Sequence, residues 1–309
     1  MAARIRLRAA VTVTAAIALL AVAGCGGTSS GGESANKKPK PVVTLGTKNF
    51  AEQYLLGQLY AQALRARGFR VVVKEDIGAS EIIHRTLQAG AIDMYPEYIG
   101  VLVTEVAHRS RRPSSAAQAY RLADGFEQGR GFTLLAPTPY SNTDALAVKP
   151  SYAKRWKLRT VADLAKVSGS VRLAAPPEFR TRFEGLVGLE QVYGLTNIRF
   201  VPSKIGEQYG ELDKGKVDVA DVFTTDGQLN GSRYTVLRDP KRIFGFQNVA
   251  PIVSVKTVQQ QGSGFTTTID RVSKTLTTQS LRQMNAEVML KKRPPAQVAQ
   301  QFLREHDLA

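Results

Sequence analysis

Short apolar segments alternate with amphipathic helical segments in two successive series along the chain. The first series begins with the strand-like residues 42–47, followed by residues 50–67, in which apolar side chains recur every four positions, as on one face of a helix. It continues through strand-like residues 69–76 and 91–94, with a helical pattern at 80–90 between them. Such alternation predicts an α/β fold with parallel strands that helices cover on both faces.

A second series follows the loop at residues 138–142. It contains helical patterns at 151–166, 181–193 and 205–214, and strand-like runs at 171–175, 198–201 and 218–223. The run 248–255 leads back to the first series, and we expect two final helices, 266–291 and 295–306, to pack there. The folded part, about 268 residues, exceeds the usual limit of one core. We therefore assign 42–141 with 246–309 to lobe I and 142–245 to lobe II.

The N-terminus has the pattern of an export signal. Arg4, Arg6 and Arg8 precede an apolar run that is short for a membrane span and ends in "VAGC" at the only cysteine, Cys25. This ending resembles a bacterial lipobox, so we predict a lipoprotein signal peptide at 1–24, lipidation of Cys25 and a disordered tether at 25–41. The alternatives are a buried thiol or a simple Ala-x-Ala cleavage site. The predicted location is the extracytoplasmic face of the bacterial cell membrane.

The formal charge of the chain, +16, falls to +11 when the three signal arginines and the tether's net two positive charges are removed. This charge either forms a binding surface for polyanions such as nucleic acid or anionic envelope polymer, or is dispersed over a basic surface. Only residues 108–113, "HRSRRP", form a dense cluster. We favour the dispersed surface and expect no nucleic-acid partner.

Catalytic and metal-binding patterns are not found in the sequence. The three histidines, His84, His108 and His306, do not lie at metal-ligand spacing from one another or from the cysteine. No nucleophile with a matching base is visible either. We therefore predict a protein that is not an enzyme and needs no cofactor or metal.

Five segments resemble the substrate-binding proteins of osmoprotectant ABC transporters, the glycine betaine, choline, carnitine and proline betaine group. They are "GTKNFAEQYLLGQLYAQALRARGF", "LQAGAIDMYPEYIG", "SNTDALAV", "EFRTRFEGLVGLEQVYGL" and "KGKVDVADVFTTDG". The resemblance extends over nearly all of 42–309. It implies a bilobal periplasmic-binding-protein fold of type II, in which two αβ lobes joined by two hinge strands close on a small solute. It further implies a monomer that presents the solute to ABC permease subunits.

Tyr95 and Tyr98 bracket Pro96, where the sequence suggests that the chain turns. A quaternary ammonium group has no hydrogen-bond donor, and aromatic ring faces therefore hold it in proteins. By resemblance, Tyr98 is one wall of such an aromatic cage, whereas we interpret Tyr95 as structural. Plain packing of Tyr98 is the alternative.

The resemblance also assigns Lys48 and Arg182 to a ligand carboxylate. A guanidinium can donate to both carboxylate oxygens, and a lysine before a helix adds positive potential. The alternatives are a solvated turn for Lys48 and a surface ion pair with Glu178 or Glu184 for Arg182.

Four positions depart from the family pattern. Asp144 and Gln247 stand where the family has tyrosines, Phe223 replaces a third tyrosine, and Val101 replaces a threonine or aspartate. These residues complete the predicted ligand-binding set with Lys48, Tyr98 and Arg182. Because the cage is incomplete, an amine with N–H groups, an amino-acid-like solute or a polyhydroxylated or aromatic solute is an alternative cargo. Alternatively, Tyr140 replaces the missing ring.

Overall fold

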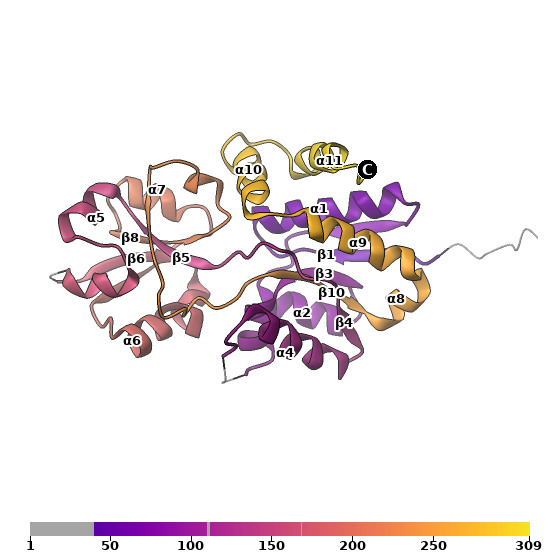
Figure 1. Cartoon of the computed structure of the whole chain (residues 1–309), viewed down its shortest axis with the longest axis horizontal. Helices are drawn as coiled ribbons and strands as arrows, with labels where there is room; N and C mark the ends of the chain where they lie inside the picture. Colours follow the sequence, from indigo (N-terminus) through magenta and orange to yellow (C-terminus); the bar gives the residue numbers. More distant parts are fainter. Residues whose placement is uncertain (1–39, 110–111, 168) are drawn as a thin grey trace, which may run out of the picture. The chain divides into compact units, whose positions relative to one another are not determined.

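The computed structural model describes residues 40–109, 112–167 and 169–309, and the predicted signal peptide, most of the tether and Cys25 lie outside these ranges. Residues 40–309 contain two five-stranded sheets, each in its own lobe (Figure 1). The strands of the first sheet come from two parts of the chain, Val43 to Leu134 and Val249 to Ser254. Those of the second sheet all lie between Asp144 and Leu237. The exact lobe limits at 141/142 and 245/246 remain predictions.

The first sheet has the strand order β2 (Val71–Lys74), β1 (Val43–Gly46), β3 (Met94–Tyr98), β10 (Val249–Ser254), β4 (Phe132–Leu134). The first three strands are parallel, as the sequence predicts, but β10 runs antiparallel to both of its neighbours. The sheet is mixed because β10 enters it from the second lobe rather than from a crossover helix.

The second sheet has the order β7 (Ile198–Pro202), β6 (Val171–Ala175), β8 (Val219–Phe223), β5 (Asp144–Val148), β9 (Thr235–Leu237). Its β5 pairs antiparallel with β8 and β9. The sequence did not indicate β9, which is only three residues long. The chain enters β5 from the first crossing and β10 from the second, so each sheet has a strand that is joined directly to a crossing.

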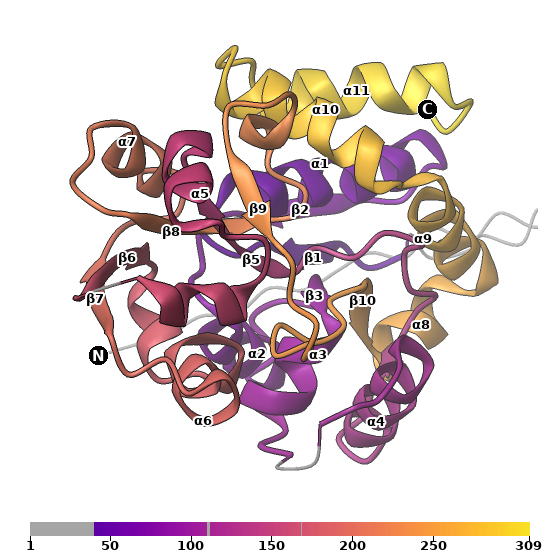
Figure 2. The same cartoon turned by 60° about the vertical axis from the view of Figure 1, so that its left-hand side comes forward.

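Helices cover the first sheet on both faces, with separate apolar clusters beneath them. One cluster involves α1, α9, α10 and α11, and the C-terminal helices contact α1 (Figures 1 and 2). The other lies under α2 and α4. The helices are α1 (Ala51–Ala66), α2 (Ser80–Gln88), α3 (Ile99–Val101), α4 (Ala116–Gln128), α8 (Val255–Gln261), α9 (Ser263–Thr275), α10 (Thr278–Met289) and α11 (Pro295–Glu305).

The second lobe has shorter helices, α5 (Pro150–Trp156), α6 (Gly188–Tyr193) and α7 (Gln208–Asp213), and two apolar clusters. Single turns occur at η1 (Leu102–Val106), η2 (Val161–Lys166), η3 (Pro177–Arg180), η4 (Phe183–Val187) and η5 (Gly227–Leu229). Helix α10 contacts η5, so the C-terminal helices also touch the second lobe. At the contact, a Cβ on Gly227 would lie 2.5 Å from backbone atoms of Ala286. No helix in the described ranges has the length and apolarity of a membrane span.

The predicted turn at Pro96 is wrong, because Met94–Tyr98 is a buried strand at the centre of the first sheet. Proline has no backbone N–H and rarely occupies a central strand. Here Pro96 lies opposite Pro251 of β10. On its other side β3 pairs with β1 at Met94 alone, so no ladder bond to β1 is lost at Pro96. Tyr95 therefore lies within a strand and Tyr98 at its end, rather than in a turn.

Three long helices predicted from periodicity are broken in the structure. The pattern 151–166 is interrupted at Lys157, whose φ of 54° is left-handed, and 266–291 is interrupted by the extended backbone of Leu276. The pattern 181–193 contains a kink at Gly185, with φ −138° and ψ −136°. A Cβ there would lie 2.1 Å from the carbonyl oxygen of Phe179, so the close approach requires glycine. Side-chain periodicity does not reveal such local backbone breaks.

Candidate ligand-binding site

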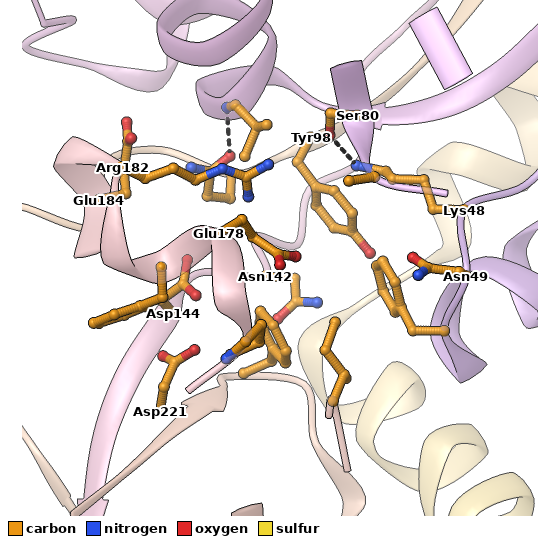
Figure 3. A pocket seen from close by; sticks show the side chains of 18 residues that line it. Lys48, Asn49, Ser80, Tyr98, Asn142, Asp144, Glu178, Arg182, Glu184 and Asp221 are labelled. Atoms are coloured by element: carbon orange, nitrogen blue, oxygen red, sulfur yellow. Dashed lines mark hydrogen bonds between the residues drawn. The ribbon is translucent and has the colours of Figure 1, made fainter. Parts of the chain in front are cut away.

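One cavity, partly open to solvent, lies between the two sheets beside the ends of β3 and β8 and the start of β5. The cavity is lined by residues from both lobes (Figure 3). All seven residues predicted to bind the ligand line it, namely Lys48, Tyr98, Val101, Asp144, Arg182, Phe223 and Gln247. The structure thus brings the predicted set together, while the role of each residue in binding stays a prediction.

Lys48 follows β1 and is 3% exposed, so it is not the solvated turn residue of the alternative interpretation. Its Nζ donates to Ser80 Oγ at 2.8 Å, as Figure 3 shows, and forms an ion pair with Glu97. The same ammonium lies 4.4 Å from the ring centroid of Tyr98. Burial lowers the pKa of Lys48, and Glu97 opposes this shift. The positive charge at this wall is therefore already paired within the first lobe.

Tyr98 stands at the end of β3, where its hydroxyl donates to Glu52 Oε1 at 2.9 Å. Its ring is nearly parallel to that of Phe50, with centroids 6.1 Å apart. Phe50 in turn stacks with Phe223 of the second lobe at 6.2 Å and 7°. These three residues, the aromatic series, connect the walls of the cavity. The sequence interpretation missed Phe50, although it directly follows Lys48-Asn49 in the motif on which the resemblance depends.

Arg182 precedes the kinked turn η4 and reaches across the cavity to the first lobe. Its Nη2 donates to both carboxylate oxygens of Glu81, at 3.0 and 3.1 Å, and its Nε lies 3.9 Å from Glu105. The alternative partners Glu178 and Glu184 do not form ion pairs with it, so that expectation is wrong. A partner from the opposite lobe could not be read from a sequence pattern, which shows only near neighbours.

Asp144 and Asp221 lie on adjacent antiparallel strands of the second sheet. Asp144 is opposite Phe223, and Asp221 precedes Phe223 by two residues, so all three side chains project from one face of the sheet and line the cavity. Figure 3 shows the two aspartates. Asp221 is 0% exposed, and neither of its carboxylate oxygens accepts a hydrogen bond from an N–H or O–H donor of the described residues. Its close polar neighbour on this face is the carboxyl of Asp144, with which it can share a proton. Burial raises the pKa of Asp144 to about 6, with Arg182 opposing. Burial and the neighbouring Asp144 raise the pKa of Asp221 well above its ordinary value.

Gln247 is 1% exposed and lies just before β10. Its Oε1 accepts a hydrogen bond from the backbone N–H of Val101 at 3.1 Å, whereas its Nε2 has no partner among the described residues. Tyr140 does not replace a ring, because it is buried in the core of the first lobe and does not line the cavity. The Tyr140 alternative is therefore not the arrangement of this structure.

Glu52, in the first turn of α1, is a buried acceptor that sequence reasoning also missed. Its Oε1 accepts from Tyr98 and from Asn142 Nδ2 at 2.9 Å. Its Oε2 accepts from Asn285 Nδ2 at 2.8 Å and from the hydroxyl of Thr225. These donors come from β3, the first crossing, α10 and the end of β8, so one carboxylate ties both lobes together. A single glutamate in a helix gives no sequence signal for such a role.

The described residues contain no group of three His, Cys, Asp or Glu side chains that could hold a metal ion. The cavity instead combines ring faces, amides and carboxylates. The chain passes twice between two lobes, each with its own sheet, and a polar and aromatic cavity lies between them. These features define a bilobal solute-binding protein. Comparison with known proteins identifies which kind.

Residues 41–305 match the family described as the substrate binding domain of ABC-type glycine betaine transport systems (OpuAC), and the chain belongs to this family. A glycine-betaine-binding protein of Pseudomonas aeruginosa is 33% identical over 279 residues, which cover 86% of this chain and 88% of the relative. A solved structure described as a glycine betaine/carnitine/choline ABC transporter has a TM-score of 0.72 at 25% identity, covering 86% of this chain and 99% of that one.

A further relative, the ergothioneine transport permease/ergothioneine binding protein EgtU of Helicobacter pylori, is 26% identical. The match covers 85% of this chain and 47% of that protein. These comparisons confirm the predicted bilobal fold and the predicted function class. The protein is the extracytoplasmic substrate-binding component of an ABC importer of the glycine betaine group, a transport protein rather than an enzyme. The alternative of a polyanion-binding envelope protein is therefore wrong.

Proposed function

We propose that this protein captures a small quaternary amine osmoprotectant, such as glycine betaine, in the cavity between its lobes and delivers it to the permease. The observation that carries the proposal is the aromatic series of Tyr98, Phe50 and Phe223 beside buried carboxylates, in a chain of this family. Ring faces and carboxylates both attract a cation that cannot donate hydrogen bonds. Closure of lobe I (42–141 and 246–309) on lobe II (142–245) would bury the solute.

The predicted residues take distinct roles in this proposal. Tyr98 and Phe223, with Phe50 between them, face the ammonium head, and Val101 and Gln247 close the wall beside β10. Arg182 is the residue for a ligand carboxylate, which would have to exchange with Glu81. Lys48 contributes positive potential at the opposite wall, although Glu97 holds its ammonium. We further propose that Cys25 carries a lipid that keeps the protein beside the permease.

Titration calorimetry with the purified protein tests the ligand class. Glycine betaine, choline, carnitine and proline betaine are injected separately, with sucrose as an uncharged control of similar polarity. We expect saturable heat for at least one of the quaternary amines and none for sucrose. Flat traces for all four quaternary amines would contradict the proposed function. Mass spectrometry of the membrane fraction tests the anchor, which predicts a diacylglycerol mass on Cys25 that a Cys25→Ser variant lacks.

Ergothioneine is a second candidate cargo. The observation that favours it is that Asp144 and Gln247 line the cavity at positions where tyrosines would complete a cage, and one relative is named for ergothioneine. Ergothioneine joins a trimethylammonium group to a ring with N–H groups, which carboxylates and amides can bind. Competition calorimetry separates the candidates, because prior saturation with ergothioneine should abolish the heat of glycine betaine if both occupy this cavity.

A further inference from the structure

The charges that line the cavity are not balanced evenly between the two lobes. Both cations, Lys48 and Arg182, are paired with carboxylates of the first lobe, Glu97 and Glu81. Asp144 and Asp221, which the second lobe contributes, form no ion pair with a lysine or arginine of the described ranges. The groups left without an ion-pair partner on the second-lobe side are therefore carboxyl groups.

Asp221 is the clearer of the two cases. A buried carboxyl group without a hydrogen-bond partner destabilises a fold, because it loses water and gains nothing in return. Both oxygens of Asp221 are buried without a donor from the described residues, and the carboxyl of Asp144 on the same face can share one proton with them but leaves their other acceptor sites open. The other charged groups around the pair are Arg182, which faces Asp144, and the acidic Glu178 and Asp226. Such a surface can be satisfied by hydrogen-bond donors from a bound molecule.

A fully alkylated ammonium cannot be that donor, because its nitrogen carries no hydrogen. We propose that Asp144 and Asp221 form a donor subsite, which accepts hydrogen bonds from an O–H or N–H group of the ligand while its cationic head lies against the aromatic series. The ligand class is thus an amine cation that carries a hydroxyl or N–H group about three bonds from its ammonium nitrogen, as the hydroxyl of choline does. This inference rests on the proposed function, since it assumes that the ligand occupies this cavity.

The position of the donor subsite relative to the aromatic rings supports this arrangement. Asp144 is the direct cross-strand neighbour of Phe223, and cross-strand pairs have Cβ atoms roughly 4.5–5.5 Å apart. A cation against the Phe223 ring is therefore within a few bonds of the two carboxylates. In Figure 3 the pair lies on the side of the cavity away from Lys48, so a donor group directed at it would not meet the ammonium.

Two ligands that differ only in the donor test the inference. Choline and ethyltrimethylammonium share the quaternary head and the two-carbon arm, and only choline has a hydroxyl group. We expect the wild-type protein to bind choline roughly tenfold to a hundredfold more tightly, as for a hydrogen bond to a charged group. In Asp221→Asn and in Asp144→Asn the preference should fall to within about threefold.

Asp218→Asn is the matched control. Asp218 lies just before the same strand, β8, but its carboxylate is bound by Arg172 and does not line the cavity. This variant should keep the full preference for choline, and melting curves should show that all three variants are folded. Equal affinities of the wild type for the two ligands would overturn the inference. A choline preference that survives in both cavity variants would overturn it as well.

Failure of the proposed function gives a different result. In that case no quaternary amine binds. The donor subsite is then tested by titrating the protonated amines dimethylethylammonium and putrescine, which carry N–H donors on the nitrogen itself. Binding of either amine that Asp221→Asn weakens at least tenfold would support the donor subsite. Lack of binding by both amines would overturn it.

Discussion

The two walls of the cavity are built on the same kind of sheet but differ in how their polar groups are satisfied. On the first-lobe wall, Lys48 is held by Ser80 and Glu97, and Tyr98 by Glu52. On the second-lobe wall, Asp221 has no hydrogen-bond donor and Asp144 no ion-pair partner among the residues that the structure describes. The first-lobe wall is therefore organised by the protein itself, whereas the second-lobe wall is completed by what binds. Four predictions test this difference, in order of decreasing effect.

Loss of the buried cation should affect the first-lobe wall most. Lys48→Met leaves Glu97 buried without its cation, and breaking a buried ion pair in this way costs about 3–5 kcal/mol of folding stability. Urea unfolding measures the change. Lys48→Met combined with Glu97→Gln should recover most of the loss, because neither charge is then buried. Lys74→Met, at the exposed end of β2, is the control and should change stability by less than about 0.5 kcal/mol. A stable Lys48→Met single variant would show that this wall does not depend on the pair.

The next largest effect is expected at the carboxylate that joins the lobes. Glu52→Gln replaces a carboxylate that accepts four hydrogen bonds by an amide, whose NH₂ group then faces donors that it cannot bind. The free energy of unfolding should fall by about 2–3 kcal/mol. Differential scanning calorimetry gives the change. Glu75→Gln serves as the control, because Glu75 is exposed and Gln58 is its one hydrogen-bond donor within the described ranges. Equal melting temperatures for Glu52→Gln and the wild type would refute the role of Glu52.

On the second-lobe wall the sign should reverse. Asp221→Asn replaces a buried carboxyl that has no donor among the described residues and lies beside the carboxyl of Asp144, and the ligand-free protein should gain about 1–2 kcal/mol of stability at neutral pH. The gain should depend on pH. Because burial raises the pKa of both aspartates in the folded state, their protonated forms favour folding at low pH. That stability is lost as the pH rises through the folded-state pKa, about 6 for Asp144.

Urea unfolding between pH 4.5 and 7.5 measures this dependence. The advantage of Asp221→Asn over the wild type should grow as the pH rises across that interval. Asp218→Asn should instead be less stable than the wild type by a nearly constant amount across that interval. Arg172 lowers the pKa of Asp218 in the folded state against the effect of burial, so its contribution is lost only as the pH falls below about 4. An Asp221→Asn variant that is less stable than the wild type at every pH would contradict the contrast between the walls.

The smallest effect is expected for the ring that joins the walls. Phe50→Leu keeps the apolar volume but removes one ring face, and the affinity for a quaternary amine should fall roughly fivefold, about 1 kcal/mol. Calorimetry with the tightest-binding amine measures it. Phe69→Leu is the matched control, because Phe69 packs against Phe265 and does not line the cavity. Equal losses in both variants would mean that the change at Phe50 acts through packing.

Much of the fold could be predicted from the sequence because strands and helices differ in their apolar spacing. The two αβ series and both crossings follow from that spacing, and the resemblance placed Lys48, Asp144 and Arg182 at one cavity. The strand at Pro96 could not be predicted, since it depends on Pro251 of a strand that is remote in sequence. The breaks at Lys157 and Gly185 are backbone features without a signal in side-chain periodicity.

The partners in the site were harder to predict than its members. Glu81 and Glu97 neutralise the two cations from elements of the first lobe, and the pairing with Arg182 exists only where the lobes meet. Asp221 could not be identified from the sequence, because an aspartate in an apolar run is usually read as the end of a strand. Its place beside Asp144 becomes visible only when the pairing of β8 with β5 is known. Phe50 could have been found, because it lies in a motif that had already been singled out.

Thermal unfolding of the wild type and Asp221→Asn, each with and without saturating choline, tests the central claim most directly. A ligand that binds only the folded protein stabilises it by RT ln(1 + L/Kd), where L is the free ligand concentration, so at one ligand concentration a tighter ligand raises the melting temperature more. The account predicts that Asp221→Asn melts at a higher temperature than the wild type without choline, and that choline raises its melting temperature less. A variant that melts lower without choline, or one that choline stabilises as much as the wild type, would contradict it.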